Sequence, residues 1–130
     1  MDFPKELKYS KTHEYLKVLS GNQAIIGITS YASNELGDVV FVELPEAGKS
    51  FKASNKFGVI ESVKSVSELY IPVDGKILEI NNDLANHPEY VNQDPYGKGW
   101  MIKIEITSDL NSKELISADE YSKFVLAQTH

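Results

Sequence analysis

A single lysine, Lys64, lies between two short segments that both favour β-strands. Phe57 to Val63 precede it and Val66 to Val73 follow it, and both segments are rich in β-branched side chains. Their close spacing predicts a β-hairpin with Lys64 at the exposed tip. A solvated lysine amine is protonated at neutral pH and is a poor general base, but this presentation suits an enzyme that acylates lysines. The simpler alternative, an ordinary solvated turn lysine, has to be weighed against the motifs around it.

Most of the remaining chain is predicted to form short strands separated by turns. The expected strands are Asn22 to Thr29, Val39 to Leu44, Gly75 to Ile80 and Trp100 to Ile106. In the last of these, Trp100, Ile102, Ile104 and Ile106 alternate with polar residues and Met101, which is the pattern of a half-buried strand.

Two helices are predicted. One spans residues 29–36, with Thr29 as N-cap and Gly37 after its last turn. The other lies near 118–127 and begins at the capping box Ser117 to Glu120. A further helical turn is expected at Asn82 to Asn86.

A weak internal repeat accompanies the strands. Gly37 to Leu44 resembles Gly75 to Ile80, and each is followed at a similar interval by another strand that starts with glycine, at Gly58 and Gly99. Two copies of one strand set predict a mainly β, flattened barrel or sandwich hybrid with a pseudo-twofold repeat, in which the Lys64 hairpin joins the halves.

Composition limits the classes of function. The chain has 130 residues, which suits a single domain over 1–130. It lacks cysteine and arginine and has a net charge of −6, so nucleic acid is not expected as a partner. No apolar stretch is long enough to span a membrane, and the N-terminus has no signal-peptide pattern. We therefore expect a soluble cytoplasmic protein of bacterial type, since the arginine-free composition suggests an AT-rich genome.

Catalytic and metal sites are not predicted. His13, His87 and His130 lack metal-ligand spacing. Ser62 has no histidine nearby in the sequence to activate it, and the glycines form no phosphate-binding loop. An enzyme is thus the least favoured class.

The motifs together resemble those of the H proteins of the glycine cleavage system, which carry lipoate and belong to the biotinyl/lipoyl domain family. The resemblance covers nearly the whole chain. Its blocks are Thr12 to Tyr15, Gly27 to Ala32, Leu36 to Gly48, Gly58 to Lys64 with Ser67, Pro72 to Gly75, Val91 to Gly97, Gly99 with Trp100, and Ser117 to Val125.

The residues beside Lys64 separate this family from its relatives. Biotin carriers place methionine on both sides of the lysine, whereas Val63 and Ser65 are found here. Lipoyl domains of 2-oxoacid dehydrogenases usually have Asp-Lys-Ala and lack the terminal extensions. Tyr15, Ser65 to Val66, and Ile71 depart from the common residues of the family without removing a group that its chemistry needs.

The resemblance implies a lipoyl-domain-like fold and lipoate in amide linkage to Lys64. The hairpin residues Glu61, Ser62, Val63 and Ser65 are implied to be read by a lipoyl-transferring enzyme. Glycine decarboxylase would load an aminomethyl group onto the lipoyl arm, aminomethyltransferase would remove it, and dihydrolipoamide dehydrogenase would reoxidise the arm. The chain itself would be a carrier and a substrate, and tethering raises the effective concentration of the arm at each enzyme.

A cleft that stores the loaded arm is also implied. The positions that match the family are Thr12, Glu14 and Glu68, and carboxylates suit an ammonium group. For each of these residues, an ordinary solvated surface position is the alternative. His13 is assigned no chemistry.

Two other functions stay open at this point. A lipoyl relay that donates lipoate to other complexes needs the same hairpin as a glycine cleavage carrier. A non-acylated β-domain that binds a partner would keep the hairpin only as a scaffold and would tolerate Lys64→Ala.

Overall fold

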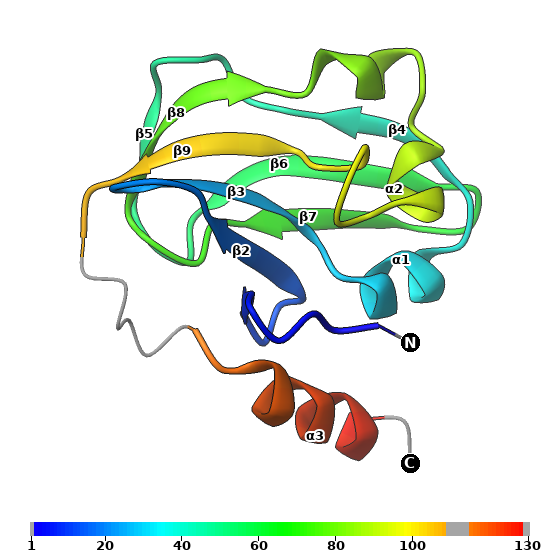
Figure 1. The fold of residues 1–130 in the computed structure, drawn as a ribbon. Coiled ribbons are helices and arrows are strands. Elements are labelled where there is room, and N and C mark those ends of the chain that lie inside the picture. Colours follow the sequence, from blue (N-terminus) through cyan, green and yellow to red (C-terminus); the bar gives the residue numbers. More distant parts are fainter. Residues whose placement is uncertain (1, 109–114, 129–130) are drawn as a thin grey trace.

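The computed structural model describes residues 2–108 and 115–128, whose strands form two antiparallel sheets (Figure 1). The six-stranded sheet has the order β1 (Lys8–Tyr9), β2 (Glu14–Val18), β3 (Gln23–Ile28), β9 (Ile102–Ile106), β8 (Gly75–Ile80) and β5 (Ser50–Phe51). The three-stranded sheet has the order β4 (Val39–Glu43), β6 (Lys56–Ser62) and β7 (Val66–Tyr70).

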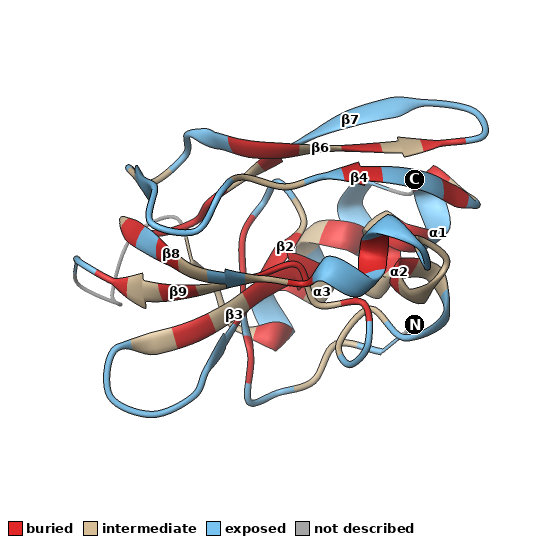
Figure 2. Cartoon of the chain, turned by 90° about the horizontal axis from the view of Figure 1, so that it is seen from above, coloured by how far each residue is buried: buried red, intermediate tan, exposed pale blue. Residues whose placement is uncertain are grey.

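These sheets form a sandwich and do not close into a barrel. Figure 2 shows the β4-β6-β7 sheet and the β3-β9-β8 strands as two layers. The sandwich part of the expected hybrid is therefore what the chain adopts. The predicted repeat has a counterpart in the pairing, because β4 with β6 and β8 with β9 are both antiparallel pairs with one register shift each.

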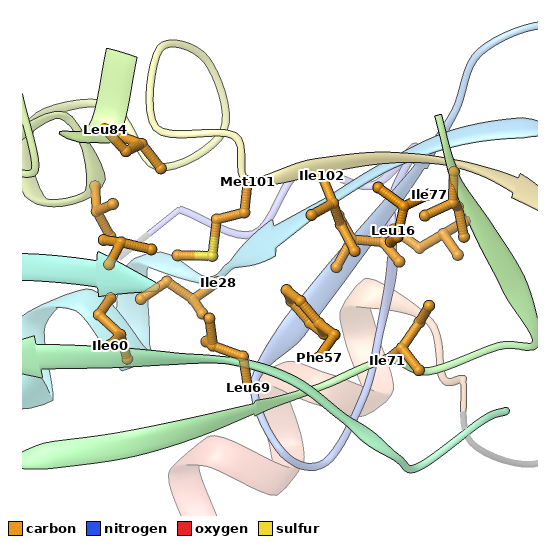
Figure 3. Packing of buried hydrophobic residues seen from close by; sticks show 14 of the residues in the cluster. Leu16, Ile28, Phe57, Ile60, Leu69, Ile71, Ile77, Leu84, Met101 and Ile102 are labelled. Carbon is orange, nitrogen blue, oxygen red and sulfur yellow. The ribbon is translucent and has the colours of Figure 1, made fainter. Parts of the chain in front are cut away.

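The main core fills the space between the layers. In Figure 3, Ile60 of β6 and Leu69 of β7 point toward Ile28 and Met101 on the opposite side. β-Branched and leucine side chains at alternate positions supply most of this core, as a two-layer β fold requires. A rigid packed base therefore supports β6 and β7.

Three α-helices and one 3₁₀ turn complete the described fold. Helix α1 (Ser30–Leu36) begins where the Thr29 hydroxyl accepts a hydrogen bond from Ala32 N at 3.2 Å, and it ends at Gly37, whose φ is 77°. The predicted helical turn is η1 (Asn82–Ala85), and α2 (Tyr90–Gln93) follows it. These elements confirm the expected helix and turn, whereas α2 was not expected.

Helix α3 (Ala118–Gln128) packs on a second, aromatic cluster. The predicted capping box forms, since Ser117 Oγ accepts from Glu120 N at 3.2 Å. Tyr121 and Val125 of α3 are buried against Tyr9 and Tyr15. The helix thus lies against β1 and β2 (Figure 1), away from the core between the sheets.

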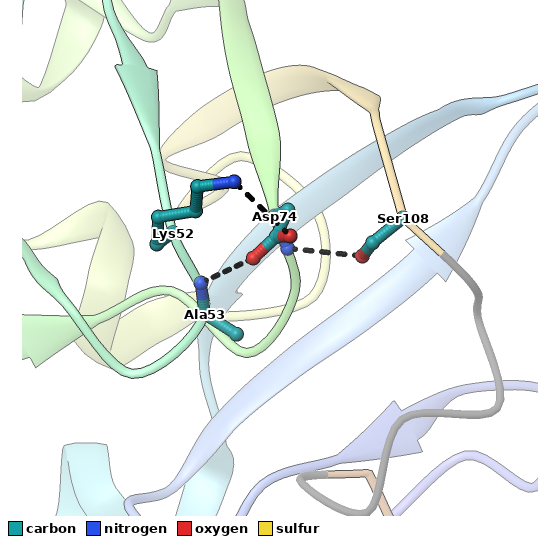
Figure 4. A network of polar contacts seen from close by, with 4 residues as sticks. All are labelled: Lys52, Ala53, Asp74 and Ser108. Carbon is teal, nitrogen blue, oxygen red and sulfur yellow. Dashed lines mark hydrogen bonds and ion pairs between the residues drawn. The ribbon is translucent and has the colours of Figure 1, made fainter.

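The end of the sandwich opposite the hairpin turn is fixed by Asp74. Its carboxylate accepts a hydrogen bond from Ala53 N at 2.7 Å and lies 3.9 Å from Lys52 Nζ, while its own N–H donates to Ser108 Oγ at 3.3 Å (Figure 4). Asp74 thus connects its own turn, which follows β7, to the segment of Lys52 and Ala53 and to Ser108. These contacts hold the turn in place.

Candidate functional site

Lys64 lies at the tip of the hairpin that β6 and β7 form. The tip is at the same end of the molecule as α1 and α2 (Figures 1 and 2), and the Lys64 side chain is exposed. This position is the one that the strand pattern predicts. The amine is thus available to another molecule, while its backbone lies in the turn between two paired strands.

The tip is held by Ser62. Its hydroxyl oxygen accepts hydrogen bonds from Lys64 N at 3.3 Å and Ser65 N at 3.1 Å, and Ser62 N donates to Ser65 O at 2.8 Å. Val63 N donates to Asp38 O at 3.0 Å, which fastens the tip to the residue before β4. The hydroxyl satisfies two backbone donors of the turn, so a serine side chain replaces the usual carbonyl acceptor.

A cleft of about 340 Å³ begins beside the tip. Ser65 lies at its edge, and its walls are the Thr12 to Glu14 segment, the face of α1, and parts of β6 and β7. Thr12, Glu14 and Glu68, the three residues expected in a storage cleft, all line it. The structure thus brings together Thr12 and Glu68, which are 56 positions apart in the sequence.

Glu14 lies at the buried end of this arrangement, only 1% exposed. One carboxylate oxygen accepts from the Ser10 hydroxyl at 2.8 Å and from the Thr12 hydroxyl, and the other accepts from Tyr70 N at 3.2 Å. Burial raises the pKa of Glu14 to about 7, although these hydrogen bonds oppose the rise. Glu14 therefore exchanges between its neutral and charged forms near neutral pH.

Glu68 and Glu35 add two exposed carboxylates to the cleft. Glu68 accepts a hydrogen bond from the Tyr70 hydroxyl at 3.1 Å. Within the part of the chain that the structure describes, no donor contacts the Glu35 carboxylate on α1. The described lining contains no lysine, so the cleft favours a cationic guest.

Sequence reasoning did not find Glu35. Tyr31, Ala32, Glu35 and Leu36 all line the cleft, and their spacing is that of one face of a helix. The expected helix over 29–36 therefore contained a signal for Glu35, because this residue lies one turn after Tyr31 on the same face of the helix.

His13 also lines the cleft, but its contacts hold the structure together. Its Nδ1 lies 2.7 Å from the Tyr121 hydroxyl, which is 2.8 Å from the Thr29 hydroxyl that caps α1. Burial lowers the pKa of His13, which favours the neutral ring. This chain of contacts connects α3, α1 and the cleft wall.

Among residues 2–108 and 115–128, no three His, Asp or Glu side chains are grouped so that they could hold a metal ion, while His130 lies outside those ranges. In the same residues, no helix is long and apolar enough to cross a membrane.

The sandwich, with a lysine on a fixed hairpin tip beside an acidic cleft, defines the class of lipoyl-type carrier domains. The model of the glycine cleavage H-protein family matches residues 7–128, and the chain belongs to that family. Its role is accordingly that of a lipoyl carrier in the glycine cleavage system.

Individual relatives agree with this assignment. A glycine cleavage system H protein of Staphylococcus epidermidis is 55% identical over 125 residues, covering 96% of this chain and 98% of the relative. One from Carboxydothermus hydrogenoformans is 52% identical over 122 residues, covering 94% and 93%. The crystal structure of a glycine cleavage system H protein from Mycobacterium marinum superposes with a TM-score of 0.86 at 36% identity, covering 93% of this chain and 97% of that one.

Proposed function

We propose that lipoate is attached in amide linkage to Lys64 and that the loaded arm is stored in the cleft beside the hairpin. The observation that carries this proposal is the position of Lys64, one residue before Ser65 at the edge of a cleft lined by Glu14, Glu35 and Glu68. Glu61, Ser62, Val63 and Ser65 would be the hairpin residues that the attaching enzyme reads.

The chain fits a covalently bound lipoyl group. Lys64 is an exposed residue of a turn whose backbone is fixed by Ser62 and Asp38. Acylation removes one positive charge, which takes the formal net charge from −6 to −7. When bound, lipoate supplies a disulfide that accepts the aminomethyl group of glycine and is restored after that group has been passed on.

The cleft residues would hold the cationic end of the loaded arm. Carboxylates give charge-assisted hydrogen bonds to an ammonium group, and Thr12 adds a hydroxyl. Ionised Glu14 is favoured by a nearby cation, so its pKa would fall from about 7 when the arm enters. While the arm is stored, the cleft would shield its reactive end from water.

The partners that we propose follow from the family. They are the lipoyl-transferring enzyme, glycine decarboxylase, aminomethyltransferase and dihydrolipoamide dehydrogenase. The chain would act as their carrier and substrate and would catalyse none of their reactions. The named relatives come from bacteria, and we propose that this chain works in the bacterial cytoplasm.

The test is the intact mass of the protein purified from its own host, with peptide mapping around Lys64. We expect one lipoyl increment, on Lys64, and none in Lys64→Arg. Lys56 at the opposite end of β6 is the internal control and should stay unmodified. An unmodified Lys64 in cells whose other lipoyl domains are fully modified contradicts the proposal.

A further inference from the structure

Four exposed apolar side chains lie around Lys64. Val63 and Val66 flank it in the hairpin and are 69% and 66% exposed, while Val40 and Phe41 on β4 are 52% and 50% exposed. The remaining exposed large apolar residues of the described chain are Val18, Leu19 and Leu126, which lie on other elements. We call the surface formed by Val40, Phe41, Val63 and Val66 the apolar patch.

Strand register places part of this patch in one row. Phe41 pairs with Glu61, and Glu61 pairs with Val66. Residues directly opposite each other in antiparallel strands project to the same face. Because the next row, Val42 and Ile60, is buried in the core, the row of Phe41, Glu61 and Val66 projects away from it.

Carboxylates border the patch. Glu61 lies within the row, and the next outward row contains Glu43 and Glu68, paired through Val59. A partner complementary to this face has an apolar contact surface bordered by cations.

We propose that the apolar patch is the docking surface for the enzyme that attaches lipoate to Lys64. This inference rests on the proposed function and names the surface that the attaching enzyme contacts. It adds β4, through Val40 and Phe41, to the hairpin residues that the sequence identifies.

The reach of the lysine side chain favours this partner. An attaching enzyme receives the bare lysine, so its active site must lie within one lysine side chain of the hairpin tip. Enzymes that use the finished arm are separated from the tip by the added length of the lipoyl chain. Close contact with Val63, Val66 and Phe41 is therefore a requirement of attachment.

The reaction at the surface is an acyl transfer. The deprotonated Nζ of Lys64 forms an amide bond with the acyl carbon of an activated lipoyl donor bound by the enzyme. The leaving group of the donor departs with the bonding electron pair, and the nitrogen gives up one proton. Docking supplies proximity and orientation for this step.

The experiment compares two double variants of the unmodified protein. Phe41→Ser with Val66→Ser removes apolar contacts from the patch, and Val18→Ser with Leu19→Ser makes the same kind of change at positions that are 44% and 40% exposed on the β2–β3 side. Initial rates of lipoyl transfer are measured by intact mass with the lipoate-attaching enzyme of the host. We expect kcat/KM to fall roughly 10- to 100-fold for the patch variant and less than about twofold for the control.

A second measurement separates attachment from later steps. The patch variant, lipoylated to completion by long incubation, should be reduced and reoxidised by dihydrolipoamide dehydrogenase within about twofold of the wild-type rate. Val63→Ser, a single change at the tip, repeats the transfer assay if the double variant loses its native circular dichroism spectrum.

Equal transfer rates for patch and control variants overturn the proposal. So does a loss of similar size in the dihydrolipoamide dehydrogenase assay, because the patch would then be a general surface for every partner. Wild-type protein that is never modified at Lys64 contradicts the proposed function itself, which distinguishes that failure from one confined to the patch.

Discussion

The hydrocarbon part of the Lys64 side chain lies against Gly37, the residue that ends helix α1. A Cβ atom on Gly37 would be 3.4 Å from Lys64 Cε. The two residues are 27 positions apart, and the contact brings Lys64 to the end of the helix whose face lines the cleft. Gly37 also has φ 77° and ψ −158°, a conformation that is available almost only to glycine.

Gly37→Ala should destabilise the fold. The backbone conformation is strained for any residue with a Cβ, and we expect the free energy of unfolding to fall by about 1–3 kcal/mol in urea titrations. Gly21→Ala is the matched control, because Gly21 has φ 59° in open space and should cost about 1–2 kcal/mol through the backbone alone. A gain in stability for Gly37→Ala contradicts this account.

Ser62→Ala should loosen the hairpin tip without unfolding the sheet. The change removes the acceptor shared by Lys64 N and Ser65 N, at about 1 kcal/mol, so hydrogen exchange of these two amides should accelerate about fivefold. Ser67→Ala removes a hydroxyl that makes no hydrogen bond in the described chain and should leave both amides unchanged. Unchanged exchange in Ser62→Ala would show that the backbone alone holds the turn.

Glu14→Gln should change how stability depends on pH. The pKa of Glu14 is about 7 in the folded protein and 4.5 as a free side chain, so its contribution is fully present below about pH 4.5 and is lost as the pH rises through 7. From pH 4 to pH 8 the wild type should lose about 3 kcal/mol of unfolding free energy that the Glu14→Gln variant does not lose. Parallel pH profiles for the two proteins contradict the raised pKa.

Glu35→Gln should shorten storage of a cationic arm. Removing the negative charge weakens an interaction worth about 1 kcal/mol at a partly exposed site, so the aminomethyl load should be lost to water about three- to fivefold faster. Intact mass follows the load over time. Glu46 is an exposed acid outside the cleft, so Glu46→Gln should lose its load at the wild-type rate. Equal half-lives of the load in all three proteins would show that Glu35 does not help to retain it.

Tyr121→Phe should weaken the attachment of α3. The hydroxyl contacts both His13 Nδ1 and Thr29 Oγ1, so its loss removes one polar contact from each of these groups at about 1–3 kcal/mol. Tyr90→Phe, whose hydroxyl makes no hydrogen bond in the described residues, should change the unfolding free energy by less than about 0.5 kcal/mol. Equal effects in the two variants contradict the role of this contact chain.

Local signals predicted the elements that they directly control. β-Branched runs located β6 and β7, and Thr29 with Gly37 located α1 to within one residue. The capping box located the start of α3. In each case the deciding interaction joins residues that are close in sequence, so no knowledge of the fold is needed.

Elements that depend on distant partners were missed. Strand β2 contains Glu14, whose burial depends on Ser10, Thr12 and Tyr70, and its charge obscured the strand pattern. The short strands β1 and β5 have two residues each, too few for any periodic signal. The cleft position of Glu35 likewise follows only when α1 is placed beside the segment around Thr12.

The strand expected from Trp100 begins instead at Ile102. The alternating pattern placed Met101 on the polar face, yet Met101 is fully buried and its N–H donates to Ile26 O at 3.0 Å. The tight turn at Gly99, where a Cβ would lie 2.6 Å from Tyr90 O, changes the direction of the chain before the strand starts. The alternating pattern in the sequence therefore begins two residues before the strand itself.

The carboxylate of Glu14 also protects the molecule from unwanted strand pairing. Strand β7 is the outer strand of its sheet, and Figure 2 shows it exposed along most of its length. Free N–H groups on such an edge attract the edge of another chain and can start aggregation. Because Glu14 accepts the Tyr70 N–H, a side chain takes the place of a neighbouring strand at that point. Replacing this acid removes a safeguard of solubility at the base of the Lys64 hairpin.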